Sequence, residues 1–239
     1  MTRIHDMGGR FGDGPIPLKK IDGKVVDDEP VFKKDWHAKA FAITVASASV
    51  GKWSIDKSRF FRESLPPKDY AKFDYYEKWS SALINLLVER GLINKNDLIE
   101  ITKKAKEDNL KVSQVTDEHQ DVLKAKDVAI TLGRGGPSAR EVLHSPKFKV
   151  GQEVRTINYS PNKNIIGGHT RLPIYARGKK GKVILHHKGH VLPDASAHDL
   201  GDSPEHLYTV EFLSTELWGD KDGNQKDSIC IDLWESYLI

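Results

Sequence analysis

The sequence contains a single cysteine, Cys230, and this scarcity restricts its chemistry more than any other feature. One thiol excludes an internal disulfide framework, and it excludes a metal site built from several thiolates of this chain. The cysteine usage is compatible with a reducing compartment. Cys230 follows Ile229 in an apolar stretch, so we expect it to be a small buried side chain.

Long apolar runs and an excess of charge of one sign are also missing. No stretch approaches the roughly 18 consecutive apolar residues of a membrane helix, and residues 1–6 contain no apolar signal core. The 37 Lys and Arg against 34 Asp and Glu leave a net charge of +3, too little to predict a nucleic-acid partner. We therefore expect a cytoplasmic protein that binds neither nucleic acid nor a membrane.

Residues 1–31 hold many glycines and prolines but few apolar side chains. Such a segment buries little of itself, so we expect an extended arm that lies on another surface. A disordered terminus is the alternative that composition leaves open. The whole chain of 239 residues, 38% hydrophobic and 30% charged, is long enough to bury one large core or two small ones.

Residues 32–133 show the apolar spacing of helices, with recognisable start and stop signals. The signals are Asp35 and Gly51 for the first helix, Ser54 or Asp56 and Pro66–Pro67 for the second, Asp74 and Gly91 for the third, Asn94 or Asn96 for the start of the fourth, and Asp117 and Gly133 for the fifth. We therefore predict a helical N-terminal domain over 32–133.

The glycine-rich segment that begins at Gly133 marks a change of periodicity from helix to strand. We place a linker at 134–147 and a second domain at 148–239. Alternating residues predict strands at 148–155, 181–185, 206–212 and 228–233. Several short strands between glycine-containing turns are typical of a small, partly open β-barrel. The predicted fold class is therefore α+β.

Two features that suggest cofactor sites do not satisfy the requirements of such sites. His186, His187 and His190 lack a cysteine or helical carboxylate at metal-ligand spacing, so we expect structural histidines and no metal ligand in this chain. Residues 133–136 lack the glycine order of a phosphate loop. The sequence also shows no Ser-His-Asp arrangement.

Several motifs together resemble the β subunit of nitrile hydratases. They are Ile4–Gly9 and Gly14–Pro15, the stretch from Arg59 to Trp79, Gly168–Gly181 (GHTRLPIYARGKKG), Glu216–Gly219 (ELWG) and Asp232–Leu238 (DLWESYL). Enzymes of that family hydrate a nitrile carbon to an amide on a trivalent cobalt or iron ion held by a cysteine cluster of the partner α subunit. The resemblance implies half of an active site, an SH3-like barrel behind the helical domain, and an N-terminal arm that wraps α.

The resemblance also assigns roles to individual residues. Arg59 and Arg171 match arginines that donate hydrogen bonds to the oxygens of oxidised cysteines, a task for which the planar guanidinium suits better than lysine. Tyr75 matches a tyrosine whose hydroxyl enters the substrate channel. The channel wall is implied at Thr44, Val45, Trp53, Ile55, Tyr76 and Trp79. Without the resemblance, Arg59 reads as a surface arginine, and Tyr75 with Trp79 as a core pair on one helix face.

Cofactor and partners follow from the same resemblance. A tryptophan at the Trp79 position is commoner in cobalt-type enzymes, which favours cobalt(III) over iron(III). The implied partner is an α subunit with an oxidised cysteine cluster, in an αβ heterodimer or an α2β2 heterotetramer, and the implied substrate is a small nitrile.

Three alternatives stay open at this point. The first is a subunit of a thiocyanate hydrolase-like relative, in which the two β-like halves are usually separate chains. The second is a non-catalytic accessory protein that delivers metal to α and resembles only its N-terminal half, against which the intact barrel sequence argues. The third is an SH3-like binding module without enzymatic function.

Overall fold

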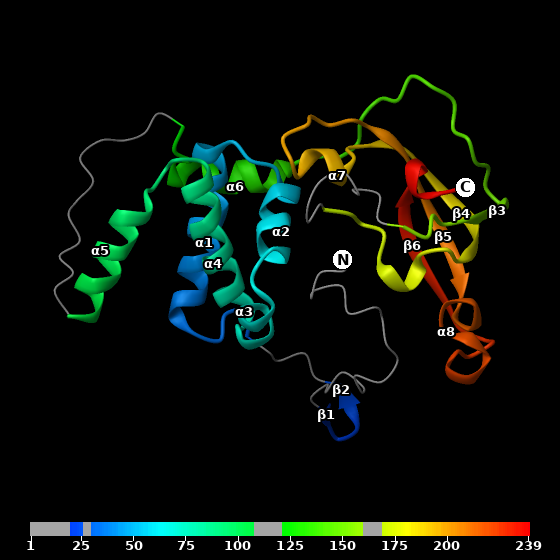
Figure 1. Ribbon diagram of the computed structural model, residues 1–239, viewed down its shortest axis with the longest axis horizontal. Helices are drawn as coiled ribbons and strands as arrows, with labels where there is room; N and C mark the ends of the chain where they lie inside the picture. The colour runs from blue at the N-terminus through cyan, green and yellow to red at the C-terminus, as the bar shows by residue number, and fades with distance from the viewer. Residues whose placement is uncertain (1–19, 26–29, 108–120, 160–168) are drawn as a thin grey trace. The chain divides into compact units, whose positions relative to one another are not determined.

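The computed structural model describes residues 20–25, 30–107, 121–159 and 169–239 (Figure 1). These residues divide into two compact units, a helical unit within Val31–Gly136 and a β-rich unit within Pro137–Ile239. A short hairpin of β1 (Lys20–Ile21) and β2 (Lys24–Val25) is grouped with the second unit. No helix among the described residues is both long enough and apolar enough to cross a membrane.

The helical unit consists of helices, the first five of which are connected by short turns. They are α1 (Asp35–Gly51), α2 (Ile55–Glu63), α3 (Pro67–Lys72), α4 (Tyr75–Glu89), α5 (Lys95–Lys106) and α6 (Ala125–Arg134). Helix α4 packs against α1 and α2. The core of this contact is formed by Trp53, Leu83 and Leu86, with Phe61 and Leu87 partly buried against them.

Side-chain caps confirm three of the predicted helix starts. Asp74 accepts a hydrogen bond from the Glu77 amide at 2.9 Å, and Glu77 accepts one from the Asp74 amide at 2.8 Å, which completes a capping box. The bond from the Glu77 amide is the main cause of a lowered pKa of Asp74. Ser54 caps α2 and Asn94 caps α5 in the same way, each through its side-chain oxygen.

Three details of the predicted helices are wrong. Asp35 is the first residue of α1, and its N-cap is Lys34, without a side-chain bond. Pro67 begins an additional short helix, because proline is well tolerated at a first helical position. The last helix begins at Ala125 and continues through Gly133, since the residue of positive φ at its C-terminus is Gly135. The predicted start at Asp117 lies outside the described residues.

The second unit contains a four-stranded antiparallel sheet, which confirms an α+β fold. Its strands are β3 (Glu153–Arg155), β4 (Lys180–His190), β5 (Glu205–Leu213) and β6 (Ser228–Trp234), paired in that order. The first strand is shorter than predicted, because the chain turns just before it, where the Gln152 amide donates to the Lys149 carbonyl at 3.0 Å. Between the strands lie η1 (Ile174–Ala176), α7 (Pro193–Ser196) and α8 (Ser214–Asp222), and η2 (Glu235–Tyr237) follows β6.

The sheet is curled, and its two edges meet through the C-terminal residues. Register shifts between β4 and β5, after Val183 and after His186, increase the local twist. Beyond η2 the chain returns to β3, where Arg155 and Ile239 exchange amide-to-carbonyl hydrogen bonds of 2.9 and 2.8 Å. The Ile157 amide donates to the Tyr237 carbonyl at 2.9 Å.

Side chains from all four strands fill the core of the β-rich unit. Its fully buried members include Leu172, Val183, Tyr208, Val210, Phe212, Leu233 and Tyr237. On β6, Ile229 and Ile231 pack against this core, while Cys230 between them is exposed. The expected burial of Cys230 is therefore wrong, because successive side chains of a strand point to opposite faces.

Candidate functional site

An aromatic group lies at the N-terminal turn of α4 in the helical unit. The rings of Tyr75 and Trp79 have centroids 5.5 Å apart, as expected for residues one helical turn apart. Tyr76 packs edge-on against Tyr75 at 5.1 Å and is buried, whereas Tyr75 is 62% exposed. The capping box therefore places an accessible phenol over a packed tryptophan.

Arg62, which the sequence analysis did not single out, completes this group from α2. Its guanidinium lies 4.4 Å from the centroid of the Trp79 ring, in a cation–π arrangement. Burial lowers the pKa of Arg62, but arginine stays charged because its ordinary pKa is so high. The sequence could have indicated Arg62 as a member of this group, because it follows Arg59 by three residues. Residues three apart on a helix are neighbours on its surface.

Arg59 lies on α2 with its guanidinium near Asp56. The Arg59 Nη1 atom is 3.2 Å from Asp56 Oδ1, and the Asp56 side chain is buried while that of Arg59 is 40% exposed. One end of the guanidinium is thus anchored at the protein surface. The Arg59 end of this partly buried pair is open to solvent, so the pair stabilises the fold by only about 0–1 kcal/mol and its main effect is to orient the donor.

The residues expected to line a channel fall into two groups. Trp53 is buried in the helical core, and the Thr44 hydroxyl donates to the Ala40 carbonyl of its own helix at 2.8 Å. Val45 is half-buried on α1, and Ile55 at the start of α2 is 64% exposed. Exposed apolar residues that the sequence analysis missed lie near the Trp79 ring as well, among them Phe41 at 6.0 Å between centroids.

Arg171 lies in the β-rich unit, on a backbone that buried groups hold in place. The Arg171 amide donates to the Tyr237 hydroxyl at 3.2 Å, and the Tyr237 hydroxyl in turn donates to the Asp194 carboxylate. The Leu172 amide donates to the Thr170 hydroxyl at 3.2 Å. The neighbouring His169 is fully buried, while Arg171 itself is exposed.

The buried pair beneath Arg171 has altered acidity. Burial raises the pKa of Asp194 to about 6, although the hydrogen bond from Tyr237 opposes this shift. Burial and the neighbouring Asp194 raise the pKa of Tyr237 well above its ordinary value. The phenol therefore keeps its proton, and its oxygen accepts from the Arg171 amide while its hydrogen points to Asp194.

The structure brings Tyr75, Tyr76, Trp79, Arg62 and Arg59 into one unit and places Arg171 in the other. The sole cysteine, exposed on β6, offers no thiolate cluster for a low-spin cobalt or iron ion. The arrangement supplies guanidinium and phenol donors together with exposed apolar rings. Such a set can bind anionic oxygens and a small polar molecule at an interface.

Comparison with known proteins covers almost the whole chain. Residues 1–128 match the family described as nitrile hydratase beta subunit, N-terminal, and residues 137–239 match nitrile hydratase beta subunit, C-terminal. Full-length relatives are similar throughout. The cobalt-containing nitrile hydratase subunit beta of Pseudonocardia thermophila is 35% identical over 238 residues, which cover 100% of this chain and 96% of that protein.

Two further relatives are matched over nearly their whole length. The low-molecular weight cobalt-containing nitrile hydratase subunit beta of Rhodococcus rhodochrous is 35% identical, with 100% of this chain and 99% of that protein covered. The nitrile hydratase subunit beta of Pseudomonas putida is 34% identical at the same coverage. A solved thiocyanate hydrolase chain from Thiobacillus thioparus is 22% identical, with a TM-score of 0.39 over 53% of this chain and 98% of that one, a likeness on which we base no argument.

Proposed function

The chain belongs to the family of nitrile hydratase β subunits, and on that premise we propose how its own residues serve the hydration of a nitrile to an amide. The observation that carries the proposal is the set of exposed donors, Arg59 and Tyr75 in the helical unit and Arg171 in the β-rich unit. Asp56 fixes the position of Arg59, Trp79 that of Tyr75, and Tyr237 that of the Arg171 backbone.

The metal centre belongs to the partner α subunit in this proposal. Because Cys230 alone cannot form a cysteine cluster, we assign the ligands to oxidised cysteines of α. Two relatives carry cobalt in their names, which favours cobalt(III) over the alternative iron(III). When bound there, the trivalent ion supplies Lewis acidity toward the nitrile or toward water.

Arg59 and Arg171 bind the oxygens of the oxidised cysteines of α. A guanidinium offers several donors in one plane, so it can hold two sulfur oxygens at fixed angles. Asp56 orients the first guanidinium, and the Tyr237 hydroxyl fixes the backbone that presents the second. Each charge-assisted hydrogen bond of this kind contributes about 1.5–3 kcal/mol.

Tyr75 orients the substrate through its exposed hydroxyl, which donates to the nitrile nitrogen or to the nascent amide. The rings of Trp79 and Tyr76 pack against the phenol ring, and the Arg62 guanidinium contacts the Trp79 ring and holds it in place. We assign the walls of the channel to Thr44, Val45, Trp53, Ile55, Tyr76 and Trp79. An aromatic and apolar wall excludes water other than the reacting molecule.

The domain organisation that we propose is an arm at 1–31 that wraps α, a helical domain at 32–133, a linker at 134–147 and an SH3-like barrel at 148–239. The end of the first compact unit at Gly136 supports a linker there. The meander of β3 to β6, the 3-10 turn η2 and the return of the chain to β3 support the barrel. The assembly is an αβ heterodimer or an α2β2 heterotetramer in the cytoplasm.

The competing functions have weaker support. An accessory protein that resembles only the N-terminal half does not fit the match at 137–239 or relatives aligned over their full length. A simple binding module does not fit these matches either. A thiocyanate hydrolase-like subunit would be indicated by thiocyanate turnover that exceeds nitrile turnover in the complex.

The proposal predicts that the isolated chain is catalytically inert. We expect no nitrile hydration by the purified chain supplied with cobalt, because its only thiol cannot hold the ion in the required state. Coexpression with a partner that carries the cysteine cluster should produce activity and cobalt content together. Nitrile hydration by the isolated chain would contradict the assignment of the centre to α.

A further inference from the structure

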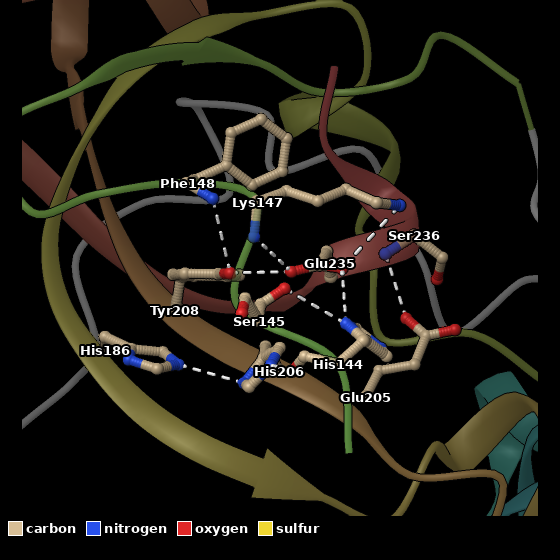
Figure 2. A network of polar contacts seen from close by, with 10 residues as sticks. All are labelled: His144, Ser145, Lys147, Phe148, His186, Glu205, His206, Tyr208, Glu235 and Ser236. Carbon is tan, nitrogen blue, oxygen red and sulfur yellow. Dashed lines mark hydrogen bonds and ion pairs between the residues drawn. The ribbon is translucent and has the colours of Figure 1, made fainter. Parts of the chain in front are cut away.

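A polar cluster lies where the segment that enters the β-rich unit passes β5 and η2 (Figure 2). One ligand atom each from His144, His206 and Glu235 lies within 4.8 Å of the others. These residues come from three separate parts of the chain. The side chains of His206 and Glu235 are buried, while that of His144 is exposed to solvent.

Glu235 is held so that one of its oxygens faces His144 and Lys147. Its Oε2 accepts hydrogen bonds from the Tyr208 hydroxyl at 2.7 Å and the Lys147 amide at 2.9 Å. Its Oε1 lies 3.8 Å from His144 Nδ1 and 3.6 Å from Lys147 Nζ. A carboxylate with one oxygen fixed and the other turned toward imidazole is typical of a metal ligand with outer support.

His206 is also fixed on its far side. Its Nδ1 is 3.1 Å from His186 Nε2, and its Nε2 is 2.8 Å from the His144 carbonyl oxygen (Figure 2). Because a carbonyl oxygen only accepts, Nε2 carries the proton in this structure and Nδ1 accepts from His186 Nε2. Metal binding at Nε2 requires the proton of His206 to move to Nδ1, which then donates to His186 Nε2 once His186 carries its own proton on Nδ1. A second-layer acceptor of this kind commonly sets the tautomer of a metal-binding histidine.

We propose that His144, His206 and Glu235 form a binding site for a zinc-class divalent ion, with water completing the coordination. Two imidazoles and one carboxylate suit zinc, whose bonds to nitrogen and oxygen are about 2.0–2.2 Å. The exposed His144 closes the remaining distance, and the ion replaces the hydrogen bond between His206 Nε2 and the His144 carbonyl. The Lys147 ammonium, now near Oε1, moves away into solvent.

A bound ion would connect three segments that are far apart in the sequence. His144 belongs to the segment that leads into the β-rich unit, His206 to β5 and Glu235 to η2. Because the ion binds only when these segments are together, it stabilises the folded unit in proportion to its concentration. The site thus stabilises the tertiary structure of the β-rich unit. This role does not depend on the proposed nitrile chemistry.

The test is zinc binding to the full chain, without an affinity tag and with Cys230→Ser, so that the exposed thiol cannot take part. Equilibrium dialysis against micromolar Zn²⁺ should give one bound ion per chain. His144→Ala should weaken binding by at least about tenfold, because it removes one of three ligands. His187→Ala, which removes a β4 histidine outside the cluster, is the matched control and should bind as the parent does.

Thermal unfolding supplies an independent readout. Zn²⁺ should raise the Tm of the parent and of His187→Ala, but not that of His144→Ala, which should stay folded because its side chain is exposed. Absence of bound zinc in the parent would overturn the proposal. So would equal affinity in His144→Ala, or a loss in His187→Ala as large as that in His144→Ala, which would place the ion on the β4 histidines.

Discussion

Arg59 and Arg171 are held in position by different kinds of contact. Arg59 is anchored through its own side chain, which contacts the buried Asp56. Arg171 is anchored through its backbone, whose amide donates to the buried Tyr237. In both cases the guanidinium is accessible while its base is fixed, which is the arrangement that a donor to a partner subunit requires.

Replacing either arginine by lysine should therefore reduce catalysis more than folding. Arg59→Lys and Arg171→Lys keep the charge but lose the planar pair of donors. Loss of one or two bonds of about 1.5–3 kcal/mol each should lower nitrile turnover by at least about tenfold. The measurement is turnover of the αβ complex, with the Tm of the free chain and the cysteine oxidation state recorded beside it.

Two further variants serve as comparisons for the arginine substitutions. Arg134→Lys, at the end of α6, should leave turnover unchanged and serves as the control. Tyr75→Phe should alter substrate kinetics while the metal content and the oxidised cysteines stay intact, since it removes one hydroxyl and no charge. Parental turnover in both Arg59→Lys and Arg171→Lys would mean that these arginines are ordinary surface residues.

Contacts between individual side chains could be predicted from the sequence where the spacing along one helix determines them. The contact between Tyr75 and Trp79 follows from their four-residue separation on a helix, and the structure confirms it. The burial of Cys230 was wrongly predicted from its apolar neighbours, although the alternation of the predicted strand puts Cys230 on the face opposite Ile229 and Ile231. His144 and Glu235 meet only through tertiary folding, so no local pattern predicts their approach.

At the scale of elements, the starts of α2, α4 and α5 could be predicted because each has a capping side chain. Helix α3 could not, since the sequence reading treated the two prolines as a stop and not as a start. The true extent of β4 was also missed. It continues to His190 across two register shifts, which interrupt the simple alternation that identifies a strand.

Gly181 on β4 allows the close approach of two strands. A Cβ at this position would lie 2.6 Å from Val210 Cγ1 and 2.9 Å from the Glu211 carbonyl oxygen of β5. Gly181→Ala should therefore destabilise the β-rich unit by about 1–3 kcal/mol, as overpacking does in well-packed interiors. Urea unfolding monitored by circular dichroism measures the change.

The control for this substitution is Gly136→Ala, because no atom lies within 4 Å of a Cβ built there. Its free energy of unfolding should match that of the parent. A Gly181→Ala chain as stable as Gly136→Ala would show that β4 and β5 can separate slightly at no cost, contrary to the packing described here.

At the scale of the whole molecule, the sequence predicted a helical half and a β half with a change near Gly133. Among the described residues, helices α1 to α6 precede strands β3 to β6 in the chain. The pairing of the C-terminal residues with β3 was not predictable, because it joins segments at opposite ends of the unit and depends on the curl of the sheet. Global topology of this kind is not encoded in any short window.

The raised pKa of Asp194, about 6, predicts a stability that depends on pH. The folded state holds this proton more tightly than the unfolded chain does, so the contribution is fully present below about pH 4 and disappears as the pH rises through about 6. Its size is on the order of 2–3 kcal/mol at most. Asp194→Asn, which mimics the protonated form, should remove this dependence.

The measurement is the free energy of unfolding of both chains between about pH 4 and pH 7, a range that brackets the two pKa values. The parent should lose stability relative to Asp194→Asn as the pH increases. A constant difference between the two chains over this range would show that folding does not raise the pKa of Asp194.

The bonds between β3 and the C-terminal residues also have a consequence for the order of folding. Helices α1, α2 and α4 make contacts between near neighbours in the sequence, which form with little loss of chain entropy. The sheet closes only when residues 155–157 meet residues 237–239, which requires a long loop to be ordered first. We therefore expect the helical unit to reach its native state first and closure of the sheet to limit the folding rate of the whole chain, which stopped-flow refolding would measure.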